Sequence, residues 1–181
     1  MTSSLVGSEM CIRDRVADVL TNPGNTAIGT RSFGSDASMV ADMVIKELEG
    51  LSSQGVFGAV KHFPGQGGVS GDSHDGAVTL DKSLEELMQT ELVPFQKALE
   101  NGVSFVMVGH ISVPQVVGDN TPASLSQMMV SNVLREQLGY QGIVITDAMN
   151  MGAVTGNYTA DQAAVMAVNA CLLYTSPSPR D

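Results

Sequence analysis

The sequence predicts an α/β fold in which parallel strands are covered by helices. Short runs that are largely apolar, such as residues 103–108 and 143–146, alternate with segments whose apolar residues recur at helical spacing. Runs of the first kind are typical of strands buried on both faces, and their alternation with amphipathic helices favours a parallel sheet. About four strand-helix units are visible, half of the eight in a TIM-type (β/α)8 barrel. We therefore expect a partial barrel with one exposed strand edge.

The first half of the chain supplies two of the expected strands and the helix between them. Residues 16–20 form a short apolar run that we expect to be the first strand. A helix is expected over about 35–53, because its apolar residues recur at helical spacing and Gly55 follows as a stop. The apolar run 56–60 is then the second strand.

The second half continues the alternation. Ser83 and Glu86 have the spacing of a capping box and predict the start of the next helix, which Pro94 should kink or divide. Thr159 and Gln162 predict a second capping box in front of the last helix. The remaining elements are expected over 103–108 (strand), 126–138 (helix), 143–146 (strand) and 163–170 (helix).

Both ends of the sequence lack the features of a folded segment. Residues 1–15 include LVGSEMCIRDR and residues 171–181 are CLLYTSPSPRD, with neither regular periodicity nor the turn residues of a linker. Both resemble translations of one transposon-type sequencing adapter, so we expect adapter-derived tails that pack poorly. The expected natural part is a single domain fragment over 16–170, and we infer no disulfide from Cys11 and Cys171.

The composition narrows the classes of partner. The 181 residues carry a formal net charge of −10, spread along the chain without a basic stripe, so no nucleic acid is expected as a partner. No apolar run approaches the roughly 20 residues that cross a bilayer, so no membrane segment is expected in this part of the protein. The sequence leaves the oligomeric state and the cellular location open.

The segment from Lys61 to His74, KHFPGQGGVSGDSH, concentrates chemically useful side chains in a glycine-rich loop. Asp72 and His74 are separated by one residue, so in an extended segment the carboxylate can orient the imidazole for proton transfer. Lys61 and His62 follow a buried strand and are candidates for binding the hydroxyls of a polar ligand. The alternatives are a flexible surface loop, a solvated Asp-Ser-His turn and a core histidine at position 62.

Three further polar residues stand near the ends of expected strands. Asp18 lies near the end of the first, His110 follows the third, and Asp147 ends the fourth after the sequence IVIT. Chemistry in parallel α/β folds collects at the carboxyl ends of the strands, so Asp147 is a candidate catalytic carboxylate. The alternative for Asp147 is a cap or turn residue, and His110, which has no spaced partner, is more typical of a structural histidine.

Several motifs together resemble one enzyme family. In chain order they are AIGTRSFGSD, KHFPGQGGVSGDSH, HISVP, PASLS and LREQLGYQGIVITDAMNMGAV. Their sequences, order and spacing are similar to glycoside hydrolase family 3, in its bacterial β-N-acetylhexosaminidase branch. The resemblance covers residues 16–170.

The resemblance implies a (β/α)8-barrel glycosidase that removes terminal β-linked N-acetylglucosamine with retention of configuration, without a metal or other cofactor. It implies that Asp147 is the nucleophile and that Asp72 and His74 are the acid/base pair. The implied carbohydrate-binding residues are Arg31, Lys61, His62 and, less securely matched, Asp18. The implied substrates are carbohydrates, with peptidoglycan as their expected source.

Two departures and three alternatives accompany this interpretation. Many relatives have histidine and aspartate where this chain has Gln66 and Gly68, which alters the expected loop contacts but not the Asp72-His74 pair. The second departure is that the early barrel strands and the part after Ala170 are expected to be missing, so the ligand-binding aspartate that relatives supply from the N-terminal part is not assigned. The alternatives are a family 3 β-glucosidase, a sugar-binding fragment without activity, and a barrel metal hydrolase. The metal hydrolase would use as ligands His62, His74, His110 and Asp147.

Overall fold

The computed structural model describes residues 16–170, and a three-stranded parallel sheet forms their centre. Its strand order is β1 (Ala59–Phe63), β3 (Phe105–Val108) and β5 (Ile143–Thr146). Each neighbouring pair is parallel, and a helix lies between successive strands along the chain. The predicted α/β class with parallel strands is confirmed.

The sheet is held in register by a buried row of valines. Val60 pairs with Val106, and Val106 pairs with Val144, with side chains at most 3% exposed. β-Branched side chains pack well on a pleated surface that is covered on both faces. This row explains why the apolar runs of the sequence become central strands.

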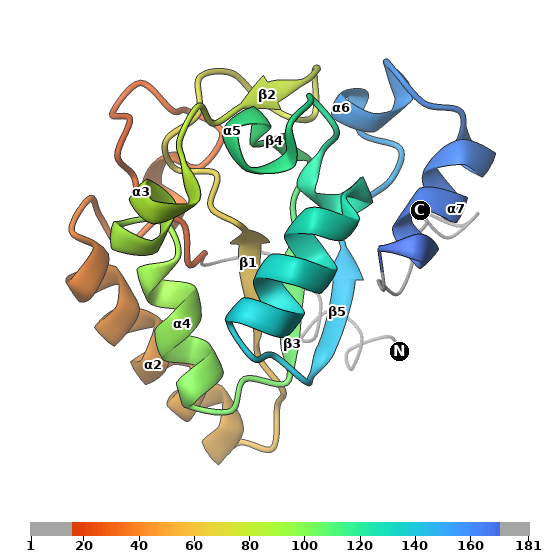
Figure 1. The fold of residues 1–181 in the computed structure, drawn as a ribbon. Coiled ribbons are helices and arrows are strands. Elements are labelled where there is room, and N and C mark those ends of the chain that lie inside the picture. The colour runs from red at the N-terminus through yellow and green to blue at the C-terminus, as the bar shows by residue number, and fades with distance from the viewer. Residues whose placement is uncertain (1–15, 171–181) are drawn as a thin grey trace, which may run out of the picture.

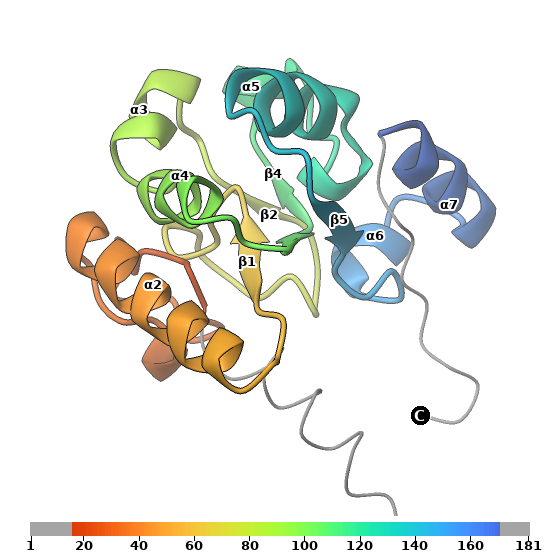
Figure 2. The ribbon, with the colours of Figure 1, turned by 90° about the horizontal axis from the view of Figure 1, so that it is seen from below.

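Helices cover the sheet along one face. They are α2 (Ala37–Ser53), the pair α3 (Leu84–Gln89) and α4 (Val93–Glu100), and η3 (Met128–Gln137). Figure 1 shows α4 and η3 in front of the strands, and the view from below in Figure 2 shows α2 beside α4 on the same outer side. The arrangement is that of one part of a barrel wall with its helices outside.

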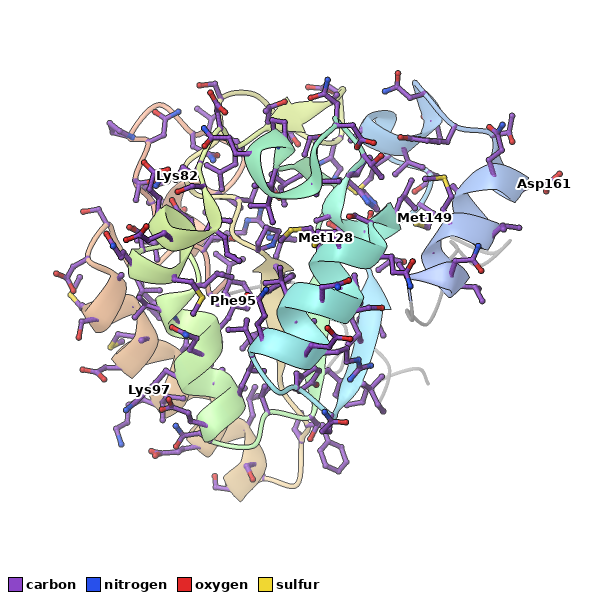
Figure 3. All side chains as sticks on the ribbon, viewed as in Figure 1. Lys82, Phe95, Lys97, Met128, Met149 and Asp161 are labelled. Atoms are coloured by element: carbon purple, nitrogen blue, oxygen red, sulfur yellow. The ribbon has the colours of Figure 1, made fainter. Side chains whose placement is uncertain are left out.

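The helix α4 shows how the sequence pattern orients a helix on this sheet. Phe95 is fully buried and meets Phe63 of β1 edge to face, with ring centroids 5.5 Å apart. Lys97 is exposed on the other side of the helix, and Figure 3 shows the two side chains on different sides of α4. Pro94 occupies the first turn of α4, where its missing N–H costs no intrahelical bond. The predicted division of this helix at the proline is confirmed.

Helix boundaries follow the capping residues. Asp36 caps α2 by accepting a hydrogen bond from Met39 N at 2.8 Å. Ser83 and Glu86 form the predicted capping box of α3. The helix η3 differs from expectation because its hydrogen bonds reach back five residues in the π-type pattern, which nothing in the local sequence predicts.

Three of the four expected strands differ in the structure, and of these β3 begins at Phe105 and not at Val103. β1 begins at Ala59, three residues after Val56, because pairing with β3 starts at Ala59 and Phe57 is 74% exposed in the connection. Lys61 and His62 therefore lie inside the strand. Residues 16–20 do not form a full strand: Val16 makes one parallel bridge to Ser32, and Ala17 N donates to Lys61 O at 2.8 Å.

Short elements collect at the carboxyl ends of the strands. Figure 1 shows β2, β4, α5 and α6 gathered at the end toward which the arrowheads of β1 and β5 point. Of the elements given below, only the helix α7 (Ala160–Asn169), with the capping box of Thr159 and Gln162, was predicted. The elements are η1 (Gly29–Arg31), β2 (Val78–Thr79), β4 (Ile111–Ser112), α5 (Pro114–Val117), η2 (Ala123–Leu125), α6 (Gly152–Thr155) and α7 (Ala160–Asn169).

The sheet is open at β5. Within residues 16–170, β5 pairs with β3 and with no second strand, and Ile143 is 42% exposed. No helix in this part of the chain is both long and apolar enough to cross a membrane. The expected adapter-derived tails, 1–15 and 171–181, and both cysteines lie outside the described residues.

Candidate active site

A cavity of about 490 Å³ opens at the carboxyl end of the sheet. It brings together side chains from η1, from β1 and the loop after it, and from the residues that follow β5. Six of the seven sequence-predicted site residues line it, and the seventh, Asp18, lies behind the wall. The lining residues are Ala27, Arg31, Lys61, His62, Gln66, Asp72, Ser73, His74, Asp147 and Ala148.

Asp18 organises one wall of the cavity from behind. Its Oδ1 accepts hydrogen bonds from the backbone N–H of His62 at 3.2 Å and of Gln66 at 2.6 Å. Its Oδ2 lies 2.8 Å from His62 Nδ1, so the ring donates this proton and leaves Nε2 directed elsewhere. Asp18 is 0% exposed and His62 is 5% exposed. A buried carboxylate thus fixes both the backbone and the ring orientation of His62.

The wall is shaped by an irregular step in β1. The register of β1 against β3 shifts between Val60 and Phe63, around Lys61 and His62. Such irregularities re-aim side chains and are frequent beside active sites. Gly67 brings the following loop against the first segment, because a Cβ at this position would collide with the carbonyl oxygen of Val19.

Asp147 enters the cavity from the end of β5. Its backbone N–H donates to Val108 O at 2.9 Å and continues the ladder between β5 and β3. Its Oδ1 accepts from Ala148 N at 2.7 Å, and its Oδ2 lies 3.8 Å from His62 Nε2. The sheet therefore holds the carboxylate beside the His62 ring, with one oxygen already bonded to backbone.

Asp72 and His74 form a pair on the loop after β1. Asp72 Oδ1 accepts from His74 N at 2.9 Å and lies 2.7 Å from His74 Nδ1. The hydrogen bond from the His74 backbone, more than the ring, lowers the pKa of the Asp72 carboxyl below its ordinary value of 3.8. Asp72 is thus an anion at neutral pH. The predicted geometry, a carboxylate that orients the imidazole, is present. Asp72 meets His74 at Nδ1, so Nε2 is the ring nitrogen that does not contact Asp72.

Arg31 reaches the cavity from η1. Its Nη2 donates to Ala27 O at 2.7 Å, which fixes the guanidinium at the cavity wall. Its positive charge also contributes to lowering the pKa of Asp72. Arg31 therefore stands on the same side of the cavity as the Asp72-His74 pair.

His110 lies below the cavity and not in its lining. It is 1% exposed, with Nδ1 at 2.6 Å from Ser124 Oγ and Nε2 at 2.9 Å from Ala148 O. A carbonyl only accepts, so the ring carries its proton on Nε2 and accepts from Ser124 at Nδ1. Burial lowers the pKa of His110 below 6.5. These contacts fit the structural role expected for His110, because they hold the turn after Asp147.

Sequence reasoning missed the residues that connect the two sides of the site. Gln66, noted only as a departure from relatives, is 3% exposed and donates from Nε2 to Ser73 Oγ at 3.1 Å. Gly152 and Ala153 donate their backbone N–H groups to His74 O and Ser73 O. Backbone contacts of this kind carry no residue-type signal, and only the glycine in the sequence MGAV hinted at a close approach.

The alternative of a metal hydrolase gains no geometric support. Among residues 16–170, no three or more histidine, cysteine, aspartate or glutamate side chains converge as potential ligands. His62, His74, His110 and Asp147 therefore do not form the four-ligand set that this alternative needs.

A larger cavity, of about 630 Å³, lies at the opposite end of the sheet. Its lining comes from the turns before β3 and β5, and its titratable side chains are Glu100 and Tyr140. The Tyr140 hydroxyl donates to Ser104 O, and burial raises its pKa to about 12. We assign the site to the smaller cavity, because the groups able to transfer protons or attack a substrate gather there.

A parallel β/α sheet with carboxylates and imidazoles around a cavity at its carboxyl end defines the class of (β/α)-barrel enzymes. The model of the family described as "Glycosyl hydrolase family 3 N terminal domain" matches residues 15–174. The chain belongs to glycosyl hydrolase family 3.

Individual relatives agree with this assignment. "Beta-hexosaminidase LpqI" of Mycobacterium tuberculosis is 39% identical over 161 residues, 86% of this chain and 41% of its own. A glycoside hydrolase family 3 β-N-acetylglucosaminidase from Paenibacillus superposes with a TM-score of 0.88 at 37% identity, over 94% of this chain and 34% of that chain. NagZ from Neisseria gonorrhoeae, solved in complex with N-trifluoroacetyl-D-glucosamine, has a TM-score of 0.78 at 31% identity, covering 91% and 47%. This chain spans less than half the length of each.

Proposed function

We propose that residues 16–170 belong to the catalytic barrel of a β-N-acetylhexosaminidase, a retaining enzyme that hydrolyses terminal β-linked N-acetylglucosamine. We base the proposal on the cavity at the strand ends, where Asp147, His74 and Asp72 line the same space as Arg31. Relatives named β-hexosaminidase and β-N-acetylglucosaminidase support the choice of sugar. The proposal concerns the protein that carries this segment with its natural flanking sequence.

Asp147 is the proposed nucleophile. Its Oδ1 is occupied by the Ala148 N–H, while Oδ2 lies on the side of His62 and the cavity. In the first step Oδ2 attacks the anomeric carbon as the glycosidic C–O bond breaks, which gives a covalent glycosyl ester on Asp147. A second attack, by water on the same carbon, breaks the ester and restores the original configuration.

His74 is the proposed acid and base, and Asp72 holds it. With its Nδ1–H donated to Asp72, His74 presents Nε2 to the leaving oxygen. In the first step Nε2 gives its proton to that oxygen, and in the second it takes a proton from the attacking water. Because Asp72 remains ionised, it accepts the Nδ1–H of His74 and fixes the tautomer and the orientation of the ring.

The remaining cavity residues are proposed to bind the sugar. Lys61 and His62 lie in β1, and the His62 ring is already oriented by Asp18. Donors that are fixed before binding lose little freedom when they meet sugar hydroxyls. Arg31 supplies a further donor from η1. Fragments of peptidoglycan, which carry this sugar, are the proposed natural substrates.

The test compares variants on two N-acetylglucosaminides, an aryl glycoside with a good leaving group and a disaccharide. Asp147→Ala should lose at least about 10⁴-fold in kcat on both, because no other group is proposed to attack. In kcat/KM, which reports the first step, His74→Ala should lose about 10² to 10⁴-fold on the disaccharide and much less on the aryl glycoside, whose leaving group needs no proton. Glu100→Ala, a carboxylate of the opposite cavity, is the control and should be unchanged.

Mass spectrometry of the quenched reaction should locate the sugar on Asp147. Undiminished turnover in Asp147→Ala, or a label on another residue, contradicts the assignment of the nucleophile. Equal losses of kcat/KM on both substrates in His74→Ala contradict its role as the acid. Faster hydrolysis of aryl glucosides than of aryl N-acetylglucosaminides would favour the β-glucosidase alternative.

A further inference from the structure

The segment that follows Asp147 touches the loop that carries the acid/base pair. Gly152 N donates to His74 O at 3.0 Å, and Ala153 N donates to Ser73 O at 3.1 Å. Both donors stand in the first turn of α6, where an amide has no carbonyl of its own helix within reach. The acceptors that satisfy these two amides therefore come from the loop.

Gly152 approaches the loop more closely than any other residue type allows. A Cβ at this position would lie 2.7 Å from His74 O and 2.7 Å from the carbonyl carbon of Asp75. Both are backbone atoms, so no flexible side chain can move aside. A side chain at position 152 would displace the loop itself.

Gly152 is in turn fixed relative to Asp147. Met151 N donates to Ala148 O at 3.2 Å and closes the turn between the carboxylate and α6. The same carbonyl accepts from the buried His110 ring at 2.9 Å. The turn is thus anchored in the core, and Gly152 stands at a set distance along it from Asp147.

The ring of His74 gains little support from packing. Its side chain is 68% exposed, and the hydrogen bond given for the ring is to Asp72, on the same loop. The position of the ring therefore depends on where the loop backbone lies. The loop meets the rest of the site through the amides of Gly152 and Ala153, which bond its backbone, and through the Gln66 side chain, which donates to Ser73 Oγ.

We propose that Gly152 is a positioning residue for the acid/base pair: it docks the loop of Asp72 and His74 onto the start of α6 and so sets where His74 stands relative to Asp147. This rests on the proposed function, which assigns the acid role to His74. Gly152 acts through the loop backbone and does not touch the substrate.

The kinetic test uses Gly152→Ala in the protein with its natural flanking sequence. Displacing the acid should lower kcat/KM on the disaccharide by about tenfold to a hundredfold, with a loss of no more than about threefold in kcat/KM on the aryl glycoside. In a His74→Ala background, Gly152→Ala should cause no further loss, because the group that it positions is gone. The matched control is Gly76→Ala in the same loop, where an added Cβ meets nothing within 4 Å.

The outcomes separate this proposal from the proposed function. If His74→Ala shows its leaving-group dependence and Gly152→Ala does not, the docking role is wrong and the proposed function stands. If His74→Ala shows no such dependence, the acid assignment fails whatever Gly152→Ala does. Additive losses in the double variant would mean that Gly152 acts independently of His74, and would overturn its positioning role.

A measurement on the unaltered protein covers the case in which Gly152→Ala does not fold. Hydrogen exchange of the Gly152 and Ala153 amides should be slowed at least about tenfold relative to an unstructured peptide, since the loop carbonyls bond them. Exchange at the unstructured rate would show that the loop is not docked in solution, and would overturn the proposal without any variant.

Discussion

The two sides of the cavity are built in opposite ways. Asp18, His62 and Gln66 form a wall that is at most 5% exposed, and Asp18 alone accepts two backbone and one ring hydrogen bond. Asp72 and His74 form a pair whose side chains are 37% and 68% exposed, with bonds mainly to each other. One side is part of the core, and the other stands on a loop.

The difference matches what each side has to do. A wall that binds sugar hydroxyls works best when its donors are fixed in advance, and buried donors are costly to leave unpaired. A group that gives one proton and takes one in each cycle gains from contact with water. Changes in the wall and in its contacts should therefore lower the free energy of unfolding, while changes in the Asp72-His74 pair should lower turnover alone.

Asp18→Ala should have the largest effect on the free energy of unfolding. It leaves two backbone N–H groups and the His62 ring without their acceptor inside the core, which we expect to destabilise the protein by about 3 kcal/mol or more. Urea unfolding measures this loss. Asp119→Ala, which removes an exposed turn carboxylate, is the control and should cost less than about 1 kcal/mol. Similar losses in both would mean that the wall is no more dependent on its carboxylate than a surface turn.

Gly67→Ala should come second. The new methyl group would collide with the carbonyl oxygen of Val19, so the loop must move away from the wall, at an expected cost of about 2 kcal/mol. Gly50→Ala is the matched control, since it adds a methyl group in open space on α2 and should raise stability by up to about 1 kcal/mol. If Gly67→Ala is as stable as Gly50→Ala, the close approach is not part of the folded state.

The sequence predicted most of what depends on periodicity and capping. Helix α2, the division at Pro94 and both capping boxes were found, because these signals are local. The start of β1 was missed, since it depends on where β3 pairs. The short strands β2 and β4 were missed for the same reason: each has two residues, and only pairing with the other defines it.

The site was predictable as a set of residues but not as a structure. The sequence motifs identified Asp147, His74, Asp72 and Arg31, and the placement of the strands predicted that these residues would lie close together. The buried acceptor role of Asp18 depends on a contact between segments more than 40 residues apart. The Gln66 contact with Ser73 depends on the rotamer of one side chain. Sequence patterns do not encode such contacts.

A pH titration of stability should show a third, smaller effect from His110. Burial lowers its pKa below 6.5, so the unfolded chain takes up a proton below that pH before the folded protein does. Stability should fall as pH drops below 6.5, with a slope of at most about 1.4 kcal/mol per pH unit from this one group. His110→Gln, which cannot titrate, should flatten that part of the curve. An unchanged slope would indicate that His110 is protonated equally in both states.

Asp72→Asn should have the smallest effect on stability and still impair the enzyme. The asparagine Oδ1 can accept the His74 N–H as the carboxylate does, and the exposed charge pair contributes little, so the free energy of unfolding at pH 7 should change by less than about 0.5 kcal/mol. The neutral amide holds the His74 Nδ1–H more weakly than the carboxylate does, so kcat/KM on the disaccharide should fall about tenfold or more. On the aryl glycoside, whose leaving group needs no proton, kcat/KM should stay near its original value. A large loss of stability in Asp72→Asn would contradict the contrast between the two sides, because it would make the loop as dependent on its carboxylate as the wall is on Asp18.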